Sequence, residues 1–215
     1  MLGSMTSVIV CGTARQLVEP DRATVSLGLT VVAKDAAGAL DDVARRSNEL
    51  TSVLDALDIP ASRRTTDGFA VAEEWEWRKD TNTLVGYRAT TGVTVVLADL
   101  GSIPPLLRAA VGSAGAQIRA LNWEVDDENP VRYELLGGAA RDAHRRATAY
   151  AEALGLRLGA VELVSESPIS AGAPDDSLRP QPMQTMARGG GAEVVVHAGQ
   201  VALTSEVHVR FSLLP

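Results

Sequence analysis

The sequence predicts an α+β protein made of two interlocked two-layer sandwiches, each a mainly antiparallel sheet with helices packed on one face. Two observations support this fold class. Several long stretches alternate apolar and polar residues with a period of two, which is typical of strands that bury one face. Between these stretches, apolar residues recur at spacings of three and four, as in helices that bury one side. Strand pairs joined by turn residues and separated by helices favour the α+β arrangement.

The order of the expected elements divides the 215 residues into two domains. Residues 5–98 are expected to form an N-terminal β-β-α-β-β sandwich, and residues 99–215 a C-terminal α-β-α-β sandwich. The last strand matches the second strand in length and alternation, so we expect it to return to the N-terminal sheet. A chain of this length lies between one large domain and two small ones, which is consistent with this division.

The chain is expected to open with a hairpin across residues 7–33. Pro20 presets its own φ, and Asp21 can hydrogen-bond its own backbone, so the residues between the two strands favour a turn. The second strand has a clear period of two, and the apolar residues on its buried side are Ala23, Val25, Leu27, Leu29 and Val31.

A long helix is expected next, over residues 36–57. Asp35 occupies the N-cap position, and Pro60 lies just beyond the last periodic residue, where it cannot continue the helix. A second hairpin follows, with a turn at residues 80–83 between two long alternating strands. The expected buried face of the helix consists of Ala36, Leu40, Val43, Ser47, Leu50, Leu54 and Leu57.

Two further helices are expected in the second half of the chain. Pro104 and Pro105 begin the first, because proline is tolerated in the first turn of a helix, and Gly112 and Gly115 close it. Asn129 is the expected N-cap of the second. The expected buried stripe of this longer helix consists of Leu136, Ala140, Ala143, Ala147, Ala151 and Leu154. So many alanines permit a close approach to the sheet.

Three strands and a loop complete the chain. Strands are expected over residues 118–125, 161–164 and 201–213, and the last of them has the clearest alternation in the sequence. Between the last two strands, prolines and glycines recur in a stretch that cannot hold a helix or a strand ladder. We therefore expect residues 167–191 to form a mobile loop.

Charge and hydropathy argue against a nucleic-acid partner and against a membrane-spanning helix. The formal net charge is -7, whereas nonspecific nucleic-acid binding depends on clustered cations. No nucleic acid is therefore expected as a partner. No apolar run approaches the roughly 20 residues that a membrane-spanning helix needs, so no integral membrane segment is expected.

The cysteine content and the N-terminus indicate a cytoplasmic location. Cys11 is the only cysteine, so the chain cannot form the internal disulfides that are common in secreted domains. The first residues lack a charged segment followed by an apolar stretch and a cleavage site. The alternative is an exported or periplasmic protein whose leader has been removed.

No catalytic, cofactor or metal site is expected from the sequence. The soft ligands are Cys11 and three histidines, and none of them shows the spacing of a zinc site. The histidines are His144, His197 and His208. His208 shares its side of the last strand with Glu206, which favours a solvated face. Three glutamates between residues 73 and 76 favour the charged side of an exposed strand over paired catalytic carboxylates.

Trp75, Trp77 and Tyr87 form the candidate interface. The two tryptophans are two residues apart, so they point to the same side of the second hairpin, whose other side is charged. Aromatic residues make up 4% of the chain, so this concentration is unusual. Either a helix covers both indoles, or they belong to a surface for self-association or for a protein partner.

Short motifs along nearly the whole chain resemble the SIMPL family. They are Gly12 followed by Pro20-Asp21, the alternation from Val25 to Val31, the helix around Ala36, Ala39 and Leu40, Gly86-Tyr87-Arg88-Ala89, Ala153-Leu154-Gly155-Leu156 and the strand after Gly199. The family includes bacterial periplasmic and outer-membrane immunogenic proteins, an oxidative-stress defence protein and an animal protein that binds a receptor-associated kinase. It offers no agreed catalytic residues.

The resemblance implies a non-enzymatic protein that assembles or binds a protein partner, linked to the cell envelope or to oxidative stress. A homo-oligomer is expected, because some family members form ring-like or channel-like assemblies. The alternative is a small-molecule-binding protein or an enzyme that uses a cleft between the two halves. A ligand cleft should contain convergent polar side chains, whereas an assembly needs an exposed apolar patch.

Overall fold

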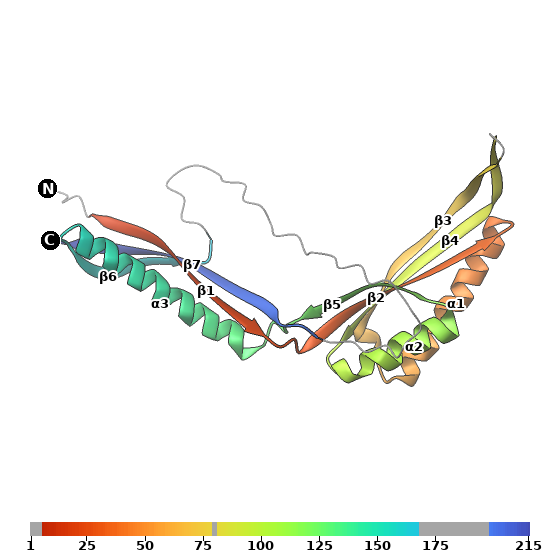
Figure 1. The fold of residues 1–215 in the computed structure, drawn as a ribbon, viewed down its shortest axis with the longest axis horizontal. Coiled ribbons are helices and arrows are strands. Elements are labelled where there is room, and N and C mark those ends of the chain that lie inside the picture. Colours follow the sequence, from red (N-terminus) through yellow and green to blue (C-terminus); the bar gives the residue numbers. More distant parts are fainter. Residues whose placement is uncertain (1–5, 79–80, 168–197) are drawn as a thin grey trace. The chain divides into compact units, whose positions relative to one another are not determined.

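The computed structural model describes residues 6–78, 81–167 and 198–215, and it confirms the α+β fold class. The described residues form two compact units: one has an antiparallel sheet with the helix α3 (Pro130–Ala153), and the other has an antiparallel sheet with the helices α1 (Ala36–Ala56) and α2 (Ile103–Ala114) (Figure 1). The first unit contains the chain up to Val18, the segment that begins at Asp127, and the segment from Gln200 to the C-terminus. The second unit contains Glu19–Asp126. The loop expected at 167–191 lies, apart from its first residue, outside the described residues.

The second unit is built on a four-stranded sheet with the strand order β3-β4-β2-β5. Two α-helices and two short 3₁₀ helices, at Ala61–Arg63 and Leu100–Ser102, connect the strands. The main elements are β2 (Arg22–Ala33), α1 (Ala36–Ala56), β3 (Arg64–Arg78), β4 (Thr81–Leu97), α2 (Ile103–Ala114) and β5 (Gln117–Glu124). All the strand pairs in this sheet are antiparallel.

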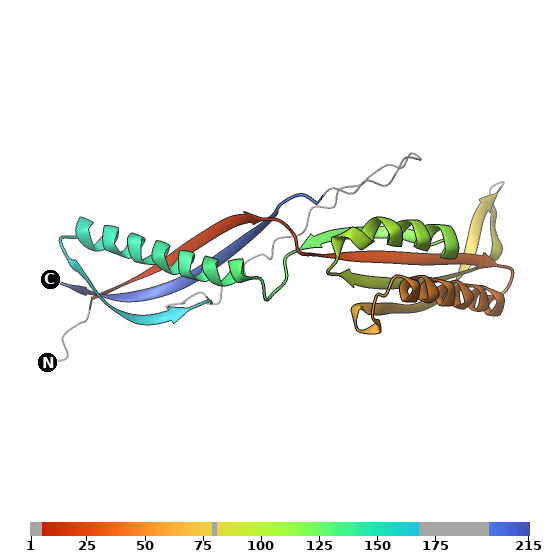
Figure 2. The ribbon, with the colours of Figure 1, turned by 90° about the horizontal axis from the view of Figure 1, so that it is seen from below.

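The core of the second unit lies between this sheet and the two helices, which pack side by side (Figure 2). The alternating apolar residues of β2 are buried, as the sequence predicted. The expected N-cap is also confirmed, because the Asp35 carboxylate accepts a hydrogen bond from the Gly38 N–H at 2.8 Å. Gly115 ends α2 in the left-handed conformation at φ 62°, which glycine adopts without steric cost.

In its described part, the first unit has a three-stranded sheet with the order β1-β7-β6 and one long helix. Its elements are β1 (Ser7–Val18), α3 (Pro130–Ala153), β6 (Arg157–Ser165) and β7 (Val201–Leu214). The helix α3 lies along β1 and β7 (Figure 1). The buried cluster between them consists of Val10, Ala139, Ala143, Ala147, Val207, Val209 and Phe211.

Gly12 allows α3 to lie unusually close to β1. A Cβ atom at this position would overlap the carbonyl oxygen of Ala139 and the backbone nitrogen of Ala143. It would also lie 2.7 Å from the Ala143 Cβ, closer than real Cβ atoms approach one another. The backbone of the helix therefore rests directly on the strand, and alanines opposite a glycine are what make this approach sterically possible.

The predicted opening hairpin is wrong. β1 pairs with β7, whereas β2 pairs with β4 and β5 in the other sheet. The residues around Pro20 and Asp21 therefore connect two sheets. The Asp21 carboxylate accepts a hydrogen bond at 2.7 Å from the Asp126 N–H, beside the end of β5. A period of two indicates a half-buried strand but does not identify the strand that pairs with it.

The division of the chain also differs from the expected boundary between residues 98 and 99. β5 belongs to the sheet of the second unit, so this unit extends to Asp126. The last strand, β7, pairs with β1 and β6 and not with β2. Its similarity to β2 in length and alternation reflects a common environment, one face buried by a helix, and not a shared sheet.

The expected stripes of α1 and α3 are confirmed in the body of each helix, where the expected residues Val43, Leu50 and Leu54 and Ala143, Ala147 and Ala151 are buried, but earlier in each helix the preceding residue is buried instead. In α3, Leu135 and Ala139 are buried, whereas Leu136 and Ala140 are exposed. In α1, Ala39 is fully buried and Leu40 is 42% exposed. Both helices have apolar residues at adjacent positions, so the sequence period alone cannot choose between them. The packing of each helix against its sheet decides which of the two neighbours is buried.

We expect Gly12→Ala to destabilise the first unit by about 1–3 kcal/mol or more, because the new methyl group overlaps the backbone of α3. Chemical denaturation measures the loss. Gly112→Ala is the matched control, since its Cβ meets no atom within 4 Å, and the same substitution within α2 should be neutral or stabilising by up to about 1 kcal/mol. Equal effects of the two variants would contradict the close packing of α3.

Asp142 should make stability depend on pH. Its carboxylate accepts hydrogen bonds from the Thr13 N–H at 3.1 Å, from Arg146 at 2.7 Å and from Arg145 at 2.9 Å. These contacts, the Thr13 N–H first, lower the pKa of Asp142 below its ordinary value. A lowered pKa contributes stability that is present above the ordinary carboxyl pKa and is lost as the pH falls through the lowered value.

We therefore expect Asp142→Asn to destabilise the protein near pH 7 and to have a smaller effect as the carboxyl group is protonated in acid. Urea denaturation over a series of pH values measures this difference. Asp41→Asn, an exposed aspartate on α1, is the control and should not reproduce the pH dependence. A loss of stability in Asp142→Asn that is the same at pH 3 as at pH 7 would contradict the assignment.

Candidate functional site

The interface predicted from the sequence, Trp75, Trp77 and Tyr87, lies where the β3–β4 hairpin extends past the rest of its sheet (Figure 1). β4 has 17 residues and β2 has 12, and their pairing ends at Tyr87 opposite Ala33. Beyond this pair, β4 is hydrogen-bonded only to β3 within the described residues. We call residues 74–78 and 81–86 the arm. A two-stranded ribbon of this kind is at best marginally stable in water unless other contacts support it.

Both tryptophans are exposed on the arm. Trp75 is 49% exposed and lies opposite Leu84, and Trp77 is 70% exposed and lies opposite Asn82. No helix among the described residues covers them. The Trp75 indole N–H donates to the Glu73 carboxylate at 3.0 Å, so these two side chains lie on the same side of β3. Tyr87 lies directly opposite Glu73, where it is half-buried and packs against the core.

The other side of the hairpin is charged, as the sequence predicted. Arg88 donates a hydrogen bond from Nε to the Glu74 carboxylate at 2.6 Å, and its guanidinium also forms an ion pair with Glu74. Hydrogen bonding to Arg88 lowers the pKa of Glu74, and the same contact raises the pKa of Arg88. The hairpin is therefore amphipathic, with an ion pair on one side and uncovered apolar side chains on the other.

The exposed apolar side chains extend along β3 beyond the arm. Phe69 is 52% exposed and Val71 is 40% exposed, and both have the same parity as the tryptophans. β3 is 15 residues long and lies at the edge of the described sheet. We call Phe69, Val71, Trp75 and Trp77 the β3 stripe. A long edge strand with exposed apolar residues is a template for pairing with another chain.

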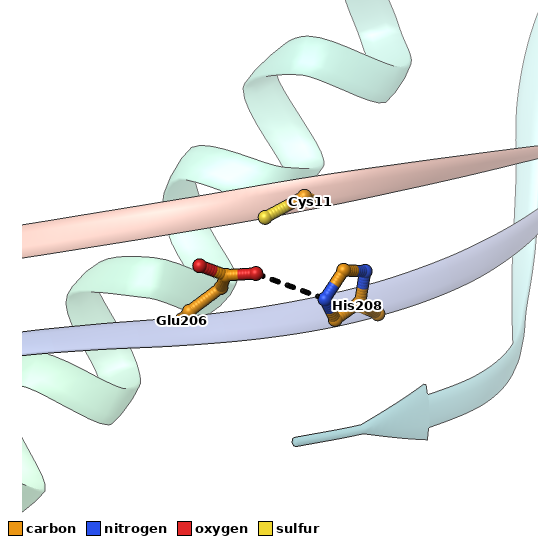
Figure 3. A group of neighbouring side chains, drawn as sticks. All are labelled: Cys11, Glu206 and His208. Carbon is orange, nitrogen blue, oxygen red and sulfur yellow. Dashed lines mark hydrogen bonds and ion pairs between the residues drawn. The ribbon is translucent and has the colours of Figure 1, made fainter. Parts of the chain in front are cut away.

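A second group of side chains lies in the first unit, and the sequence analysis did not bring it together. Cys11 on β1 is paired directly with His208 on β7, and Glu206 is two residues before His208 on the same side. Figure 3 shows the three side chains pointing toward one another. One ligand atom from each lies within 4.8 Å of the other two, and His208 Nε2 is 3.0 Å from Glu206 Oε1. We call these three residues the Cys-Glu-His group.

The Cys-Glu-His group lies on the side of the sheet that faces away from α3. Val10 and Gly12 on β1, and Val207 and Val209 on β7, pack under the helix, so the residues between them point outward. The His208 side chain is 15% exposed and that of Glu206 is 54% exposed. Burial raises the pKa of the Cys11 thiol, and the neighbouring Glu206 raises it further. A raised pKa is the opposite of what an activated cysteine nucleophile needs.

The sequence analysis did not group these three residues because it compared spacings along the chain. Cys11 and His208 are at opposite ends of the sequence and become neighbours only through the β1–β7 pairing, in place of the predicted opening hairpin. The sequence did contain one signal for this group: Glu206 and His208 are two residues apart in a strand, so their side chains lie on the same side of it. His144 lies apart on α3, with its ring 5.9 Å from that of Phe211, and His197 lies outside the described residues.

The comparisons with known proteins agree with the family resemblance of the sequence motifs. The sequence profile of SIMPL, described as a protein of unknown function (DUF541), matches residues 8–211. The chain belongs to the SIMPL family. The resemblance seen in the sequence is therefore confirmed over nearly the whole chain. No helix of the described residues is long and apolar enough to cross a membrane.

Three relatives illustrate the similarity. The uncharacterized protein YggE of Edwardsiella ictaluri is 30% identical over 72% of this chain and 65% of its own length. YggE of Escherichia coli K12 is 24% identical over 97% of this chain and 83% of its own length. The 26 kDa periplasmic immunogenic protein of Brucella melitensis is 28% identical over 74% of this chain and 66% of its own length. The matches thus span just under two thirds of the Edwardsiella and Brucella proteins.

Among solved structures, a hydantoinase/carbamoylase family amidase from Burkholderia ambifaria has 19% sequence identity and a TM-score of 0.27 to this SIMPL protein. The likeness covers 49% of this chain and 28% of that chain. It is too low to indicate a shared fold or function.

Proposed function

We propose that this SIMPL protein is a non-enzymatic assembly protein in which the edge strand β3 binds β3 of a second copy. The observation that carries the proposal is the β3 stripe, whose four apolar side chains are between 40% and 70% exposed. Aromatic residues are enriched in the well-packed centres of protein interfaces and contribute much of the binding energy there. Trp75 and Trp77 are therefore the expected anchors.

Backbone geometry favours a second copy of the same strand as the partner. Among the described residues no strand pairs with the outer edge of β3, so an antiparallel neighbour could bind the N–H and C=O groups along it. Two identical edges related by a two-fold axis pair antiparallel, and their stripes then lie on the same side of a continuous sheet. The stripe of one copy would extend that of the other, so apolar surface would meet apolar surface beside Glu73, whose carboxylate already accepts the Trp75 indole N–H.

The ion pair on the opposite side of the hairpin fits this arrangement. Glu74 and Arg88 neutralise each other within one chain, so they require no partner across the interface. Glu73 lies within the stripe, but it accepts the indole N–H of Trp75. Natural proteins usually place charged side chains on exposed edge strands to prevent pairing. Here one side of the hairpin carries the apolar β3 stripe, and on the other side the charges of Glu74 and Arg88 neutralise each other.

We expect the parent protein to sediment as a dimer at tens of micromolar, and Trp75→Ala with Trp77→Ala to sediment as a monomer. Loss of an anchor residue typically costs about 2 kcal/mol or more, which is about thirtyfold in affinity. Amide hydrogen exchange at residues 64–78 should be slower in the dimer. Tyr133→Ala with Tyr150→Ala is the matched control, because it removes two exposed aromatic side chains from α3.

Val71→Lys provides a second test that leaves both indoles in place. A lysine within the β3 stripe should prevent dimerisation while the isolated fold is retained, since Val71 is already 40% exposed. A parent protein that is monomeric at tens of micromolar would contradict the proposal. A dimer that persists in Val71→Lys would show that another surface holds the two copies together. A parent protein that stays monomeric but binds an added β-strand peptide would show that the partner is a different chain.

We propose the exported location, the alternative considered from the sequence, as the place where this assembly acts. The relatives support it, because the Brucella proteins are named periplasmic. The cytoplasmic location expected from the sequence has no support from them. Cell fractionation of the product of the native gene should recover the protein outside the cytoplasm, and recovery with a cytoplasmic marker enzyme would contradict this location.

A further inference from the structure

The Cys-Glu-His group has the geometry of an incomplete coordination sphere. Cys11 and His208 are directly opposite one another on paired strands, where the ladder holds Cβ atoms about 4.5–5.5 Å apart. Glu206 joins them from the same side of β7. All three backbone positions belong to regular strands, so their separation is set by the sheet and not by a loop.

We propose that Cys11, Glu206 and His208 bind a zinc ion on the open face of the β1–β7 sheet. A thiolate sulfur, an imidazole nitrogen and a carboxylate oxygen are the three ligand types that Zn²⁺ accepts in proteins. Mg²⁺ and Ca²⁺ prefer oxygen ligands only, so the sulfur and nitrogen select against them. Binding replaces the thiol proton with the metal and releases that proton to the solvent.

The distances require only a small adjustment. Zinc bonds of about 2.0–2.3 Å place neighbouring ligand atoms of a tetrahedron roughly 3.3–3.6 Å apart. The ligand atoms now lie within 4.8 Å of one another, and the His208–Glu206 pair is at 3.0 Å. The exposed Glu206 side chain can move to open its pair with His208 and close the longer distances. We expect rotation about side-chain bonds to provide this adjustment without a shift of the strands.

Three protein ligands leave a fourth tetrahedral position, which a water molecule would occupy. Zinc sites closed by four protein ligands are usually structural, whereas an open position is typical of sites where the metal meets solvent or a small ligand. The site would also connect the first strand of the chain to the last. Because the unfolded chain separates these strands, metal binding should raise the thermal stability of the first unit.

Cobalt substitution tests the proposal directly. We titrate the metal-free protein with Co²⁺ alone and expect visible tetrahedral bands together with a thiolate-to-cobalt charge-transfer band, both saturating at one ion per chain. Competition with Zn²⁺ should remove the bands. Cys11→Ser should abolish the charge-transfer band, and Glu206→Gln and His208→Gln should each weaken binding by about tenfold or more, since even outer-shell partners of metal ligands contribute this much.

Two control variants separate this site from unspecific binding. His144→Gln removes a histidine on α3 outside the group, and His197→Gln removes the histidine that lies outside the described residues. Both should bind Co²⁺ like the parent. The unfolding midpoint of each metal-free variant checks that the fold is retained. A titration without a charge-transfer band, a band that persists in Cys11→Ser, or binding lost only in His197→Gln would overturn the proposal.

Discussion

The antiparallel ladder between β1 and β7 is the constraint on which the first unit depends. It pairs all 12 residues of β1, from Ser7 opposite Ser212 to Val18 opposite Val201. Because strand residues alternate between faces, this register decides which side chains meet α3 and which face away from it. It places Gly12 under the helix and Cys11 opposite His208. A shift of one residue would exchange the packed face and the open face of the strand.

The helix α3 packs against one face of the β1–β7 sheet through small residues. Gly12 and the alanines of the helix bring the two backbones together, so the contact is made by backbone and methyl groups and not by long side chains. Such a contact buries little surface for each residue but leaves few voids. Asp142 adds a polar contact at the free edge of β1, where it accepts the Thr13 N–H that no strand within the described residues satisfies.

In the second unit, the main constraint is that β3 and β4 are longer than β2. β2 is buried along its apolar side and anchors a large core, but it stops at Ala33. β3 and β4 continue beyond it without a third strand among the described residues, so the same alternation that buries Val93 and Val95 leaves Trp75 and Trp77 uncovered. Gly86 lies at the point of divergence, where a Cβ atom would overlap the Ala33 carbonyl oxygen. The exposed indoles are thus a consequence of chain geometry, and they make the β3 stripe a surface that a second chain could bury.

The sequence by itself determined the class of the fold and the local elements. Asp35, Asn129 and Gly115 specified helix ends because caps depend on residues within one turn, and the alternation in β2 specified its buried side. Only the tertiary structure decided which strands pair, because a period of two describes one strand and contains no information about its neighbour. It likewise decided between Leu40 and Ala39, and between Leu136 and Leu135, because which neighbour is buried depends on how the helix packs against its sheet. The tertiary structure also decided the Cys-Glu-His group, because its residues come from opposite ends of the chain and meet only when the β1–β7 ladder forms.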